Sequence, residues 1–320
     1  MNIRICGVGS ALPALTVTND DLSKIMDTSD EWISTRTGIR TRHLATEETT
    51  TGLAVEAAKQ ALEDACITPD EIELIIGASA TPDNIVPSLA CEVQREIGAS
   101  NAIAFDVTAG CSGFLFAMSI AQAYIVSGKC RNALLIGAEV LSKIMDWSDR
   151  STCVLFGDGA GAAVVRGEEN AMCYMTQGSD GARGSVLSCM NRPVNHPYHV
   201  QDSRHAFVHM EGQEVFKFAV RTVPVAIDQL LAEAKLTADD IDYFFLHQAN
   251  LRILESVAKR LKQPMEKFPV NITECANTSA ASVPILLTEY KKSGRLHEGD
   301  KIILAGFGAG LTWGAALLTW

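Results

Sequence analysis

Two segments of the chain repeat each other, and this duplication restricts the fold more than any other feature. Residues 57–74, AAKQALEDACITPDEIEL, match residues 226–243, AIDQLLAEAKLTADDIDY, at a constant offset. Each copy predicts an amphipathic helix, a Thr-x-Asp turn, and then an apolar run short enough for a strand. We therefore expect two similar halves related by a pseudo-two-fold axis.

A second pair of segments extends the repeat. Residues 111–128 and 277–294 both begin with a small polar cluster and close on Ser-Gly, a signal for the end of a helix. An apolar strand follows each of them. Alternating helices and strands predict an α/β fold in which each half is a doubly wound unit with a mostly parallel sheet. The boundary that fits this repeat divides the chain into residues 1–168 and 169–320.

Three residues with reactive or hydrogen-bonding side chains are predicted to lie beyond the carboxyl ends of strands, which is where open α/β sheets bind ligands. Cys111 follows the predicted strand IAFDV and opens a helix, and Asn277 holds the equivalent place in the second copy. His247 ends the strand within FFLHQAN, the counterpart of LIIGAS in the first half. The duplication predicts that these three side chains meet.

Each of the three has both a chemical and a structural interpretation. At a helix N-terminus, Cys111 is expected to form a thiolate that attacks an acyl thioester, its own N–H serving an oxyanion hole. His247 can act as a base or as a neutral donor, and Asn277 as a donor that never ionises. The alternatives are a buried cysteine, a histidine bonded to backbone, and an asparagine N-cap.

Two other functions fit the motifs less well. The order Cys, His, Asn also occurs in papain-like hydrolases, but the cysteine motif of that class is absent and the duplicated architecture differs. The glycine-rich stretches at 156–165 and 307–318 lack the patterns GxGxxG and GK[ST], so a nucleotide site is not indicated. They predict tight turns that lead into strands.

The composition of the chain further restricts its partners, its compartment and its metal content. The 320 residues are 47% hydrophobic with a net charge of −11, which disfavours nucleic acid as a partner. The nine cysteines are scattered, and neither a signal peptide nor a membrane span is recognisable, so we expect reduced thiols in the cytoplasm. His196, His199, His205 and His209 lie in an irregular stretch that we interpret as surface, without a metal site.

Five ordered motifs resemble the β-ketoacyl-acyl-carrier-protein synthase III family of the thiolase superfamily. They are DVTAGCSGF, LHQANLR, NTSAAS, DEWISTRTGIRTR and STCVLFGDGAGAAV, and together they span most of the chain. The resemblance implies a homodimer of duplicated five-layer αβαβα subunits that moves an acyl group from acyl-CoA to Cys111 and condenses it with malonyl-acyl-carrier protein. It implies neither a metal nor a cofactor, because acyl-CoA is a substrate. His247 and Asn277 are implied to promote decarboxylation and stabilise the enolate.

The resemblance also implies binding residues. Trp32 would stack on adenine beside Arg150, and the small residues around Cys111 would admit the pantetheine arm. Basic residues of the segment LRILESVAKRLK would face the acidic carrier protein, although solvated helix charges are an alternative. The residues implied for coenzyme A are Trp32, Arg36, Thr37, Arg150 and Gly212. Those implied for carrier docking are Lys217, Gln248, Ala249, Asn250, Leu251, Arg252 and Lys259.

Two positions depart from the family pattern. Relatives commonly read FGGG where this chain reads FGAG, which places Ala309 at the second oxyanion N–H. Many relatives carry an aromatic residue where this chain has Val86, so we expect a primer pocket, formed by Val86 and Phe307, that accepts longer or branched acyl groups. A relative that passes the acyl group from Cys111 to another acceptor, such as a secondary-metabolite synthase, is the alternative function.

Overall fold

The computed structural model describes residues 1–199 and 207–320, and its framework is two β-sheets, each drawn from one half of the chain. The first sheet has the order β1-β7-β6-β4-β5 and the second the order β11-β12-β13-β8. The strands of the first sheet are β1 (Asn2–Ala11), β4 (Leu74–Ala78), β5 (Ile103–Val107), β6 (Asn132–Glu139) and β7 (Gly159–Glu168). Those of the second are β8 (Cys173–Ser179), β11 (Tyr243–Leu246), β12 (Lys301–Gly308) and β13 (Thr312–Thr319).

Both sheets are mixed, so the prediction of mostly parallel sheets is wrong. β4 is parallel to β5 and β6, and β11 is parallel to β12. The other pairs, β1 with β7, β6 with β7, β12 with β13 and β13 with β8, are antiparallel. The reason lies in the glycine-rich stretches: β12 returns directly into β13 through residues 309–311, whereas a parallel strand needs a crossover helix. The prediction that these stretches turn into strands is confirmed.

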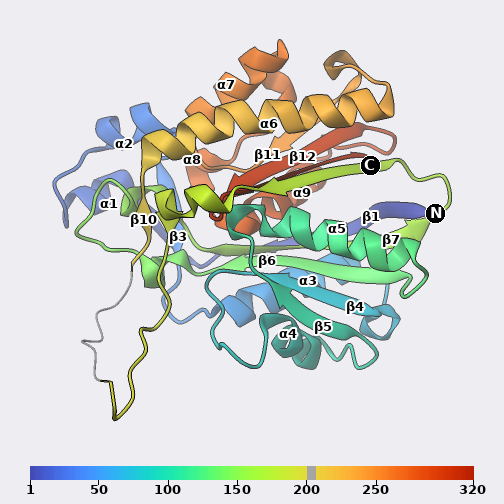
Figure 1. Cartoon of the computed structure of the whole chain (residues 1–320), viewed down its shortest axis with the longest axis horizontal. Helices are drawn as coiled ribbons and strands as arrows, with labels where there is room; N and C mark the ends of the chain where they lie inside the picture. Colours follow the sequence, from blue (N-terminus) through green and yellow to red (C-terminus); the bar gives the residue numbers. More distant parts are fainter. Residues whose placement is uncertain (200–206) are drawn as a thin grey trace.

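Helices complete the five layers αβαβα, as Figure 1 shows. α5 (Gly113–Val126) and α9 (Ser282–Lys292) lie between the two sheets. α3 (Thr50–Asp64) and α4 (Leu89–Ile97) cover the outer face of the first sheet, while α6 (Gly212–Ala234) and α7 (Leu251–Leu261) cover the second. The predicted duplicated thiolase-like architecture is confirmed.

The sequence of each helix matches its layer. α5, which packs between the two sheets, contains no charged residue and buries Phe114, Leu115 and Met118. α7, on the outside, buries Ile253, Leu254 and Val257 against the second sheet and exposes basic residues on its other face. Three large apolar clusters fill the spaces between successive layers.

The repeated turn has the same structure in both halves. The carboxylate of Glu71 accepts from the amide of Thr68, and that of Asp240 accepts from the amide of Thr237, each at 2.8 Å. Each pair forms a capping box around a 3₁₀ turn, η1 (Pro69–Glu71) or η6 (Ala238–Asp240), which leads the chain from an outer helix into β4 or β11. The repeated sequence therefore forms the same hydrogen bonds in both halves.

Shorter elements gather near the carboxyl ends of the strands. They are β2 (Leu15–Thr18), α1 (Asn19–Ser23), α2 (Asp30–Thr37), β3 (Thr41–Leu44), α8 (Ile272–Cys275), β9 (Leu187–Ser188) and β10 (His209–Met210). Among the described residues, no helix is long and apolar enough to cross a membrane, and no cluster of three His, Cys, Asp or Glu side chains could hold a metal ion. His205 lies outside the described residues. The cytoplasmic location stays a prediction.

Close packing of α3 on β1 gives a test of the layered arrangement. A Cβ added to Gly9 would overlap the carbonyl oxygen of Ala57 and lie 2.6 Å from the amide nitrogen of Ala61. We expect Gly9→Ala to lower the free energy of unfolding by about 1–3 kcal/mol, measured by urea denaturation, because the helix must move away from the strand. Gly181→Ala is the control, since no atom lies within 4 Å of its added Cβ. Equal stability of the two variants would contradict this packing.

Candidate active site

A cavity of about 190 Å³ opens where strands of both sheets end, and Cys111, His247 and Asn277 all line it. Cys111 comes from the first half, His247 and Asn277 from the second. The structure therefore brings together the three residues that the duplication predicted to meet. Most of the remaining lining is apolar, including Leu141, Ile144, Val215, Phe216 and Phe307.

Cys111 lies in the 3₁₀ turn η2 (Gly110–Ser112), directly before α5, and two glycines allow a second loop to reach it. A Cβ on Gly308 would overlap the amide nitrogen of Cys111. Gly110 has φ +53°, and a Cβ there would lie 2.7 Å from the amide nitrogen of Ala309. The small residues of this motif thus first serve contact between the two loops. This contact places the Ala309 amide beside the turn that carries the cysteine.

The sulfur of Cys111 is a thiol at rest. Burial raises its pKa to about 12, and the hydrogen bond from Ser279 only partly offsets this. The expectation of a thiolate at a helix start is therefore wrong for the free protein. Desolvation of the sulfur is the largest cause of this shift, and Cys111 lies in a short 3₁₀ turn that precedes the first turn of α5.

His247 is a neutral ring with a defined orientation. It is 2% exposed, and burial lowers its pKa to about 3. Its Nδ1 lies 2.7 Å from the Ser282 hydroxyl, and the amide of Gln248 donates to that same oxygen at 3.4 Å. The hydroxyl proton is therefore available to Nδ1, and we assign the ring proton to Nε2. The ring of Phe307 meets His247 edge-on at 5.4 Å between centroids.

Asn277 is held by its backbone and by its own side chain. Its amide donates to Leu155 and its carbonyl accepts from Gly157, each at 3.0 Å. Its Oδ1 accepts from the amide of Ser279 at 2.8 Å, which leaves Nδ2 free to donate toward a ligand. Thr278 occupies the N-cap position of η8 (Ser279–Ala281), but its side chain makes no cap hydrogen bond. The Oδ1 of Asn277 accepts the first amide of that turn instead, so the cap and the donor role are compatible.

Three further polar residues support this group and were missed as functional residues in the sequence. The hydroxyl of Ser282 lies 2.7 Å from Nδ1 of His247, Ser279 lines the cavity with Cys111, and fully buried Glu139 accepts a 3.1 Å hydrogen bond from Ser279. Both serines lie in the motif NTSAAS, so the motif contained them. Glu139 ends a strand whose residues 133–138 are apolar, and a single acidic residue in that place is the sequence signal that points to it.

Three of the residues predicted to bind coenzyme A, Trp32, Arg36 and Arg150, lie together around the partly buried ring of Trp32. The guanidinium groups of Arg36 and Arg150 lie 4.8 and 5.2 Å from the Trp32 ring centroid. Gly212 begins α6 and lines the cavity. Thr37 is only 4% exposed, and its hydroxyl donates to Ile33 and accepts from Ile39, so the prediction that it contacts the nucleotide is wrong.

Of the residues predicted to dock the carrier protein, some are exposed on the surface and others have a structural role. Lys217, Arg252 and Lys259 are exposed on α6 and α7. Arg252 donates to the carbonyl of Thr35 at 2.8 Å, which ties α7 to the helix that carries Trp32. Leu251 packs on Gly38, Asn250 caps α7, and Ala249 lines the cavity. Arg183, Lys217, Arg221 and Arg260 line a neighbouring groove, and Arg183 and Arg221 were not anticipated.

Gln248 is not a docking residue. Its side chain is fully buried, with Nε2 donating to the carbonyls of Leu246 and Pro269. Its Oε1 accepts from the amides of Asn271 and Ile272. The prediction that it touches a carrier protein is therefore wrong, because every hydrogen-bonding atom of this amide stabilises the loop before α8.

The two residues of the predicted primer pocket lie apart. Phe307 lines the cavity and is 4% exposed. Val86 is 82% exposed and its neighbour Ile85 72% exposed, and neither lines the cavity of its own chain. A role for Val86 therefore requires a second subunit.

The five-layer duplicated fold, with Cys111, His247 and Asn277 lining one cavity, is the architecture of the thiolase-like condensing enzymes. Two family models match the chain, 3-oxoacyl-[acyl-carrier-protein] synthase III at residues 105–181 and the C-terminal region of the same family at residues 231–320. The chain belongs to the β-ketoacyl-[acyl-carrier-protein] synthase III family. It is an acyltransferase, and the family comprises the initiating condensing enzymes of fatty acid synthesis.

Similar proteins match over the whole chain. The β-ketoacyl-[acyl-carrier-protein] synthase III of Clostridium acetobutylicum is 47% identical over 321 residues, covering 100% of this chain and 99% of that protein. The 3-oxoacyl-[acyl-carrier-protein] synthase III of Aquifex aeolicus has a TM-score of 0.93 at 45% identity, covering 99% and 100% of the two chains. The priming β-ketosynthase of the R1128 polyketide biosynthetic pathway has a TM-score of 0.93 at 37% identity, covering 99% and 96%.

The neutral state of His247 predicts how stability depends on pH. The folded pKa of about 3 lies below the unfolded value of about 6.5, so below about pH 6.5 only the unfolded chain takes up this proton. This residue therefore removes stability as the pH falls. We expect His247→Gln to reduce the loss of unfolding free energy between about pH 6.5 and 4.5 by roughly 2–3 kcal/mol, at about 1.4 kcal/mol per pH unit.

The measurement is urea denaturation at both pH values for the wild type and the variant. His297→Gln, which replaces an exposed histidine, is the control. An unchanged acid sensitivity in His247→Gln would show that the ring is protonated in the folded protein.

Proposed function

We propose that this enzyme transfers the acyl group of an acyl-CoA primer to Cys111 and condenses it with malonyl-acyl-carrier protein. The products are 3-oxoacyl-carrier protein, carbon dioxide and coenzyme A. The observation that carries the proposal is one apolar cavity lined by a partly buried thiol and by two neutral side-chain donors, His247 and Asn277. Neutral donors suit a reaction whose negative charge develops on a carbonyl oxygen.

In the first step Cys111 gives its thiol proton to solvent, and the sulfur attacks the thioester carbonyl. The backbone N–H groups of Cys111 and Ala309, on the two loops in contact, are the donors for the resulting oxyanion. The carbon–sulfur bond to coenzyme A then breaks, and its thiolate takes a proton from solvent. The primer remains on Cys111 as a thioester.

In the second step His247 and Asn277 act together. Nε2 of His247 and Nδ2 of Asn277 donate to the carbonyl oxygen of the malonyl thioester, so the bond to the carboxylate breaks with its electrons held as an enolate. The carbanion attacks the acyl group on Cys111, the carbon–sulfur bond breaks, and the cysteine thiolate takes a proton from solvent. A protonated histidine would neutralise the enolate too strongly to release it, and burial prevents that state.

The binding surfaces follow from the same arrangement. The adenine end of coenzyme A would use Trp32, Arg36 and Arg150, with Gly212 beside the pantetheine channel. The carrier protein, which is acidic, would dock on the basic faces of α6 and α7, where Lys217, Arg252 and Lys259 are exposed. Ala249, Asn250 and Leu251 would lie at the mouth between the two surfaces.

A homodimer completes the proposal. β5 is an edge strand, its first residue Ile103 is 56% exposed, and no strand among the described residues pairs with its outer side. An exposed apolar edge is a place for strand pairing with a second copy. Such pairing would also cover Ile85 and Val86, allowing Val86 to close the partner's primer pocket. A residue smaller than an aromatic ring there would leave room for longer primers.

The proposed reaction can be tested with acetyl-CoA and malonyl-acyl-carrier protein. We expect acetoacetyl-carrier protein and one acetyl mass on the Cys111 peptide, neither of them with Cys111→Ser. His247→Ala and Asn277→Ala should still be acylated but should condense about a hundred- to thousand-fold more slowly, because each removes one oxyanion donor. Mass spectrometry measures both steps. Free acetate alone would indicate a hydrolase, and transfer to another acceptor a secondary-metabolite synthase.

The docking surface gives a separate prediction. Arg252→Glu should weaken the use of malonyl-acyl-carrier protein and increase its KM, because reversing a rim charge slows association with an acidic partner. The same variant should use malonyl-CoA normally. Lys59→Glu, an exposed charge reversal on α3, is the control. An equal loss with malonyl-CoA would place the damage of Arg252→Glu inside the cavity.

A further inference from the structure

A buried carboxyl group, that of Glu139, lies close to the active site but has no part in the steps above. Glu139 ends β6, is fully buried, and does not line the cavity. A carboxyl group in such a place is costly unless it is hydrogen-bonded. The donors that surround Glu139 therefore show which parts of the chain this side chain holds together.

The donors around Glu139 come from both halves of the chain. In the first half, the hydroxyls of Thr81 and Ser79 donate to Oε2 at 2.5 and 3.4 Å. The amide of Ala80 lies 3.1 Å from both carboxylate oxygens. In the second half, the hydroxyl of Ser279 donates to Oε1 at 3.1 Å. A carboxylate can accept from all of these groups because each of its oxygens has two lone pairs.

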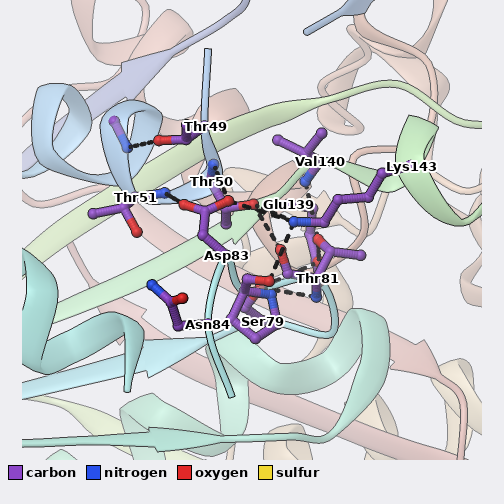
Figure 2. A network of polar contacts seen from close by, with 12 residues as sticks. Thr49, Thr50, Thr51, Ser79, Thr81, Asp83, Asn84, Glu139, Val140 and Lys143 are labelled. Carbon is purple, nitrogen blue, oxygen red and sulfur yellow. Dashed lines mark hydrogen bonds and ion pairs between the residues drawn. The ribbon is translucent and has the colours of Figure 1, made fainter. Parts of the chain in front are cut away.

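The loop that follows β4 is itself held in place by a polar network, which Figure 2 shows. Asp83 accepts from the amides of Thr50 and Thr51, at the start of α3, at 3.1 and 2.7 Å. The hydroxyl of Thr50 donates to the carbonyl of Thr81 at 2.6 Å. The loop that donates to Glu139 is therefore tied to α3, and this anchoring gives the carboxylate a defined position.

Ser279 connects this anchored carboxylate to the active site. It has φ +51°, a left-handed conformation that serine rarely adopts, and its hydroxyl is bonded to Glu139. In this conformation its backbone N–H donates to Oδ1 of Asn277 at 2.8 Å. An asparagine amide has an accepting oxygen and a donating nitrogen, so a donor that binds the oxygen decides which way the amide is turned. The N–H of Ser279 thus leaves Nδ2 of Asn277 as the atom that donates to a ligand.

We propose that Glu139 is a positioning residue for Asn277: it holds Ser279 in the left-handed conformation, and Ser279 keeps the Asn277 amide turned so that Nδ2 donates to the enolate. The inference rests on the proposed function, because Nδ2 acts in the condensation step. Loading of the primer uses the backbone amides of Cys111 and Ala309 instead. Loss of the hold on Ser279 should therefore slow condensation without slowing the loading of Cys111.

The kinetic test compares two Ser→Ala changes beside the same carboxylate, above the pKa of Glu139, which burial raises to about 7. Ser279→Ala should slow condensation with malonyl-acyl-carrier protein on the order of 10- to 100-fold, because it misplaces one oxyanion donor. Acetylation of Cys111, measured by mass spectrometry, should keep its wild-type rate. Ser79→Ala is the matched control: it removes the 3.4 Å hydrogen bond to Glu139 but leaves Ser279 bonded, so both rates should be unchanged. In the Asn277→Ala background, Ser279→Ala should slow condensation no further.

Glycine separates a role in backbone conformation from a role in packing. Glycine adopts the left-handed conformation without a side-chain hydrogen bond, so Ser279→Gly should condense faster than Ser279→Ala, although alanine is closer to serine in size. Glu139→Met removes the acceptor and should slow condensation as Ser279→Ala does. If circular dichroism shows that Glu139→Met is unfolded, the two Ser279 variants decide the question. Equal condensation rates for these two variants, or equal slowing of loading and condensation, would overturn the proposal.

Urea denaturation tests the hold of Glu139 on Ser279 without any activity. In the wild-type background, Ser279→Gly should lower the urea midpoint, because the hydrogen bond to Glu139 is lost. In the Glu139→Met background the serine has no acceptor and keeps its unfavourable φ, so Ser279→Gly should raise the midpoint. A change of the same sign in both backgrounds would contradict the hold. If the wild type formed no condensation product, the proposed function would fail, while the denaturation result would still decide whether Glu139 holds Ser279.

Discussion

The contact between the loops at Gly110 and Gly308 is the constraint on which the site depends. It joins the start of α5, from one half of the chain, to the end of β12, from the other. A single methyl group at Gly308 would overlap the backbone of Cys111. The contact sets the spacing between the nucleophile and the amide of Ala309. It also closes the floor of the cavity, so that the reacting groups are buried.

Burial then determines the protonation states. Cys111 is held as a thiol and His247 as a neutral ring, and Asn277 never ionises. None of the three is charged at neutral pH, so the site presents hydrogen-bond donors without a fixed charge. Fixed dipoles in a dry cavity act strongly on charge that develops during a reaction. Ser279 and Ser282 fix the orientation of these groups.

The sequence contained the fold and the reacting residues because both depend on local patterns. The duplicated helix, turn and strand predicted two halves, and the helix starts at Cys111 and Asn277 predicted their meeting place. The pKa of Cys111 was not predictable, since it depends on atoms contributed by distant segments. Thr37 and Gln248 were misassigned for a similar reason: a motif marks a polar residue, but only the folded chain shows whether its polar atoms face a ligand or the backbone. The prediction of parallel strands was wrong where the chain connects two strands through a short glycine-rich turn, because only a crossover helix makes neighbouring strands parallel.

The two large sheets differ in their number of strands, because the first sheet has a fifth strand, β5. The second sheet ends at β11, whose residues Phe244, Phe245 and Leu246 are buried, while β5 in the first sheet exposes Ile103. Asn2 on β1 donates to the carbonyl of Cys173 on β8, so these two edges face each other within the chain. On the proposed dimer, one edge per subunit is used and pairs with its own copy, which closes the assembly at two. Had the duplication preserved an open strand in both halves, unlike edges could pair head to tail and the subunits would grow into fibres.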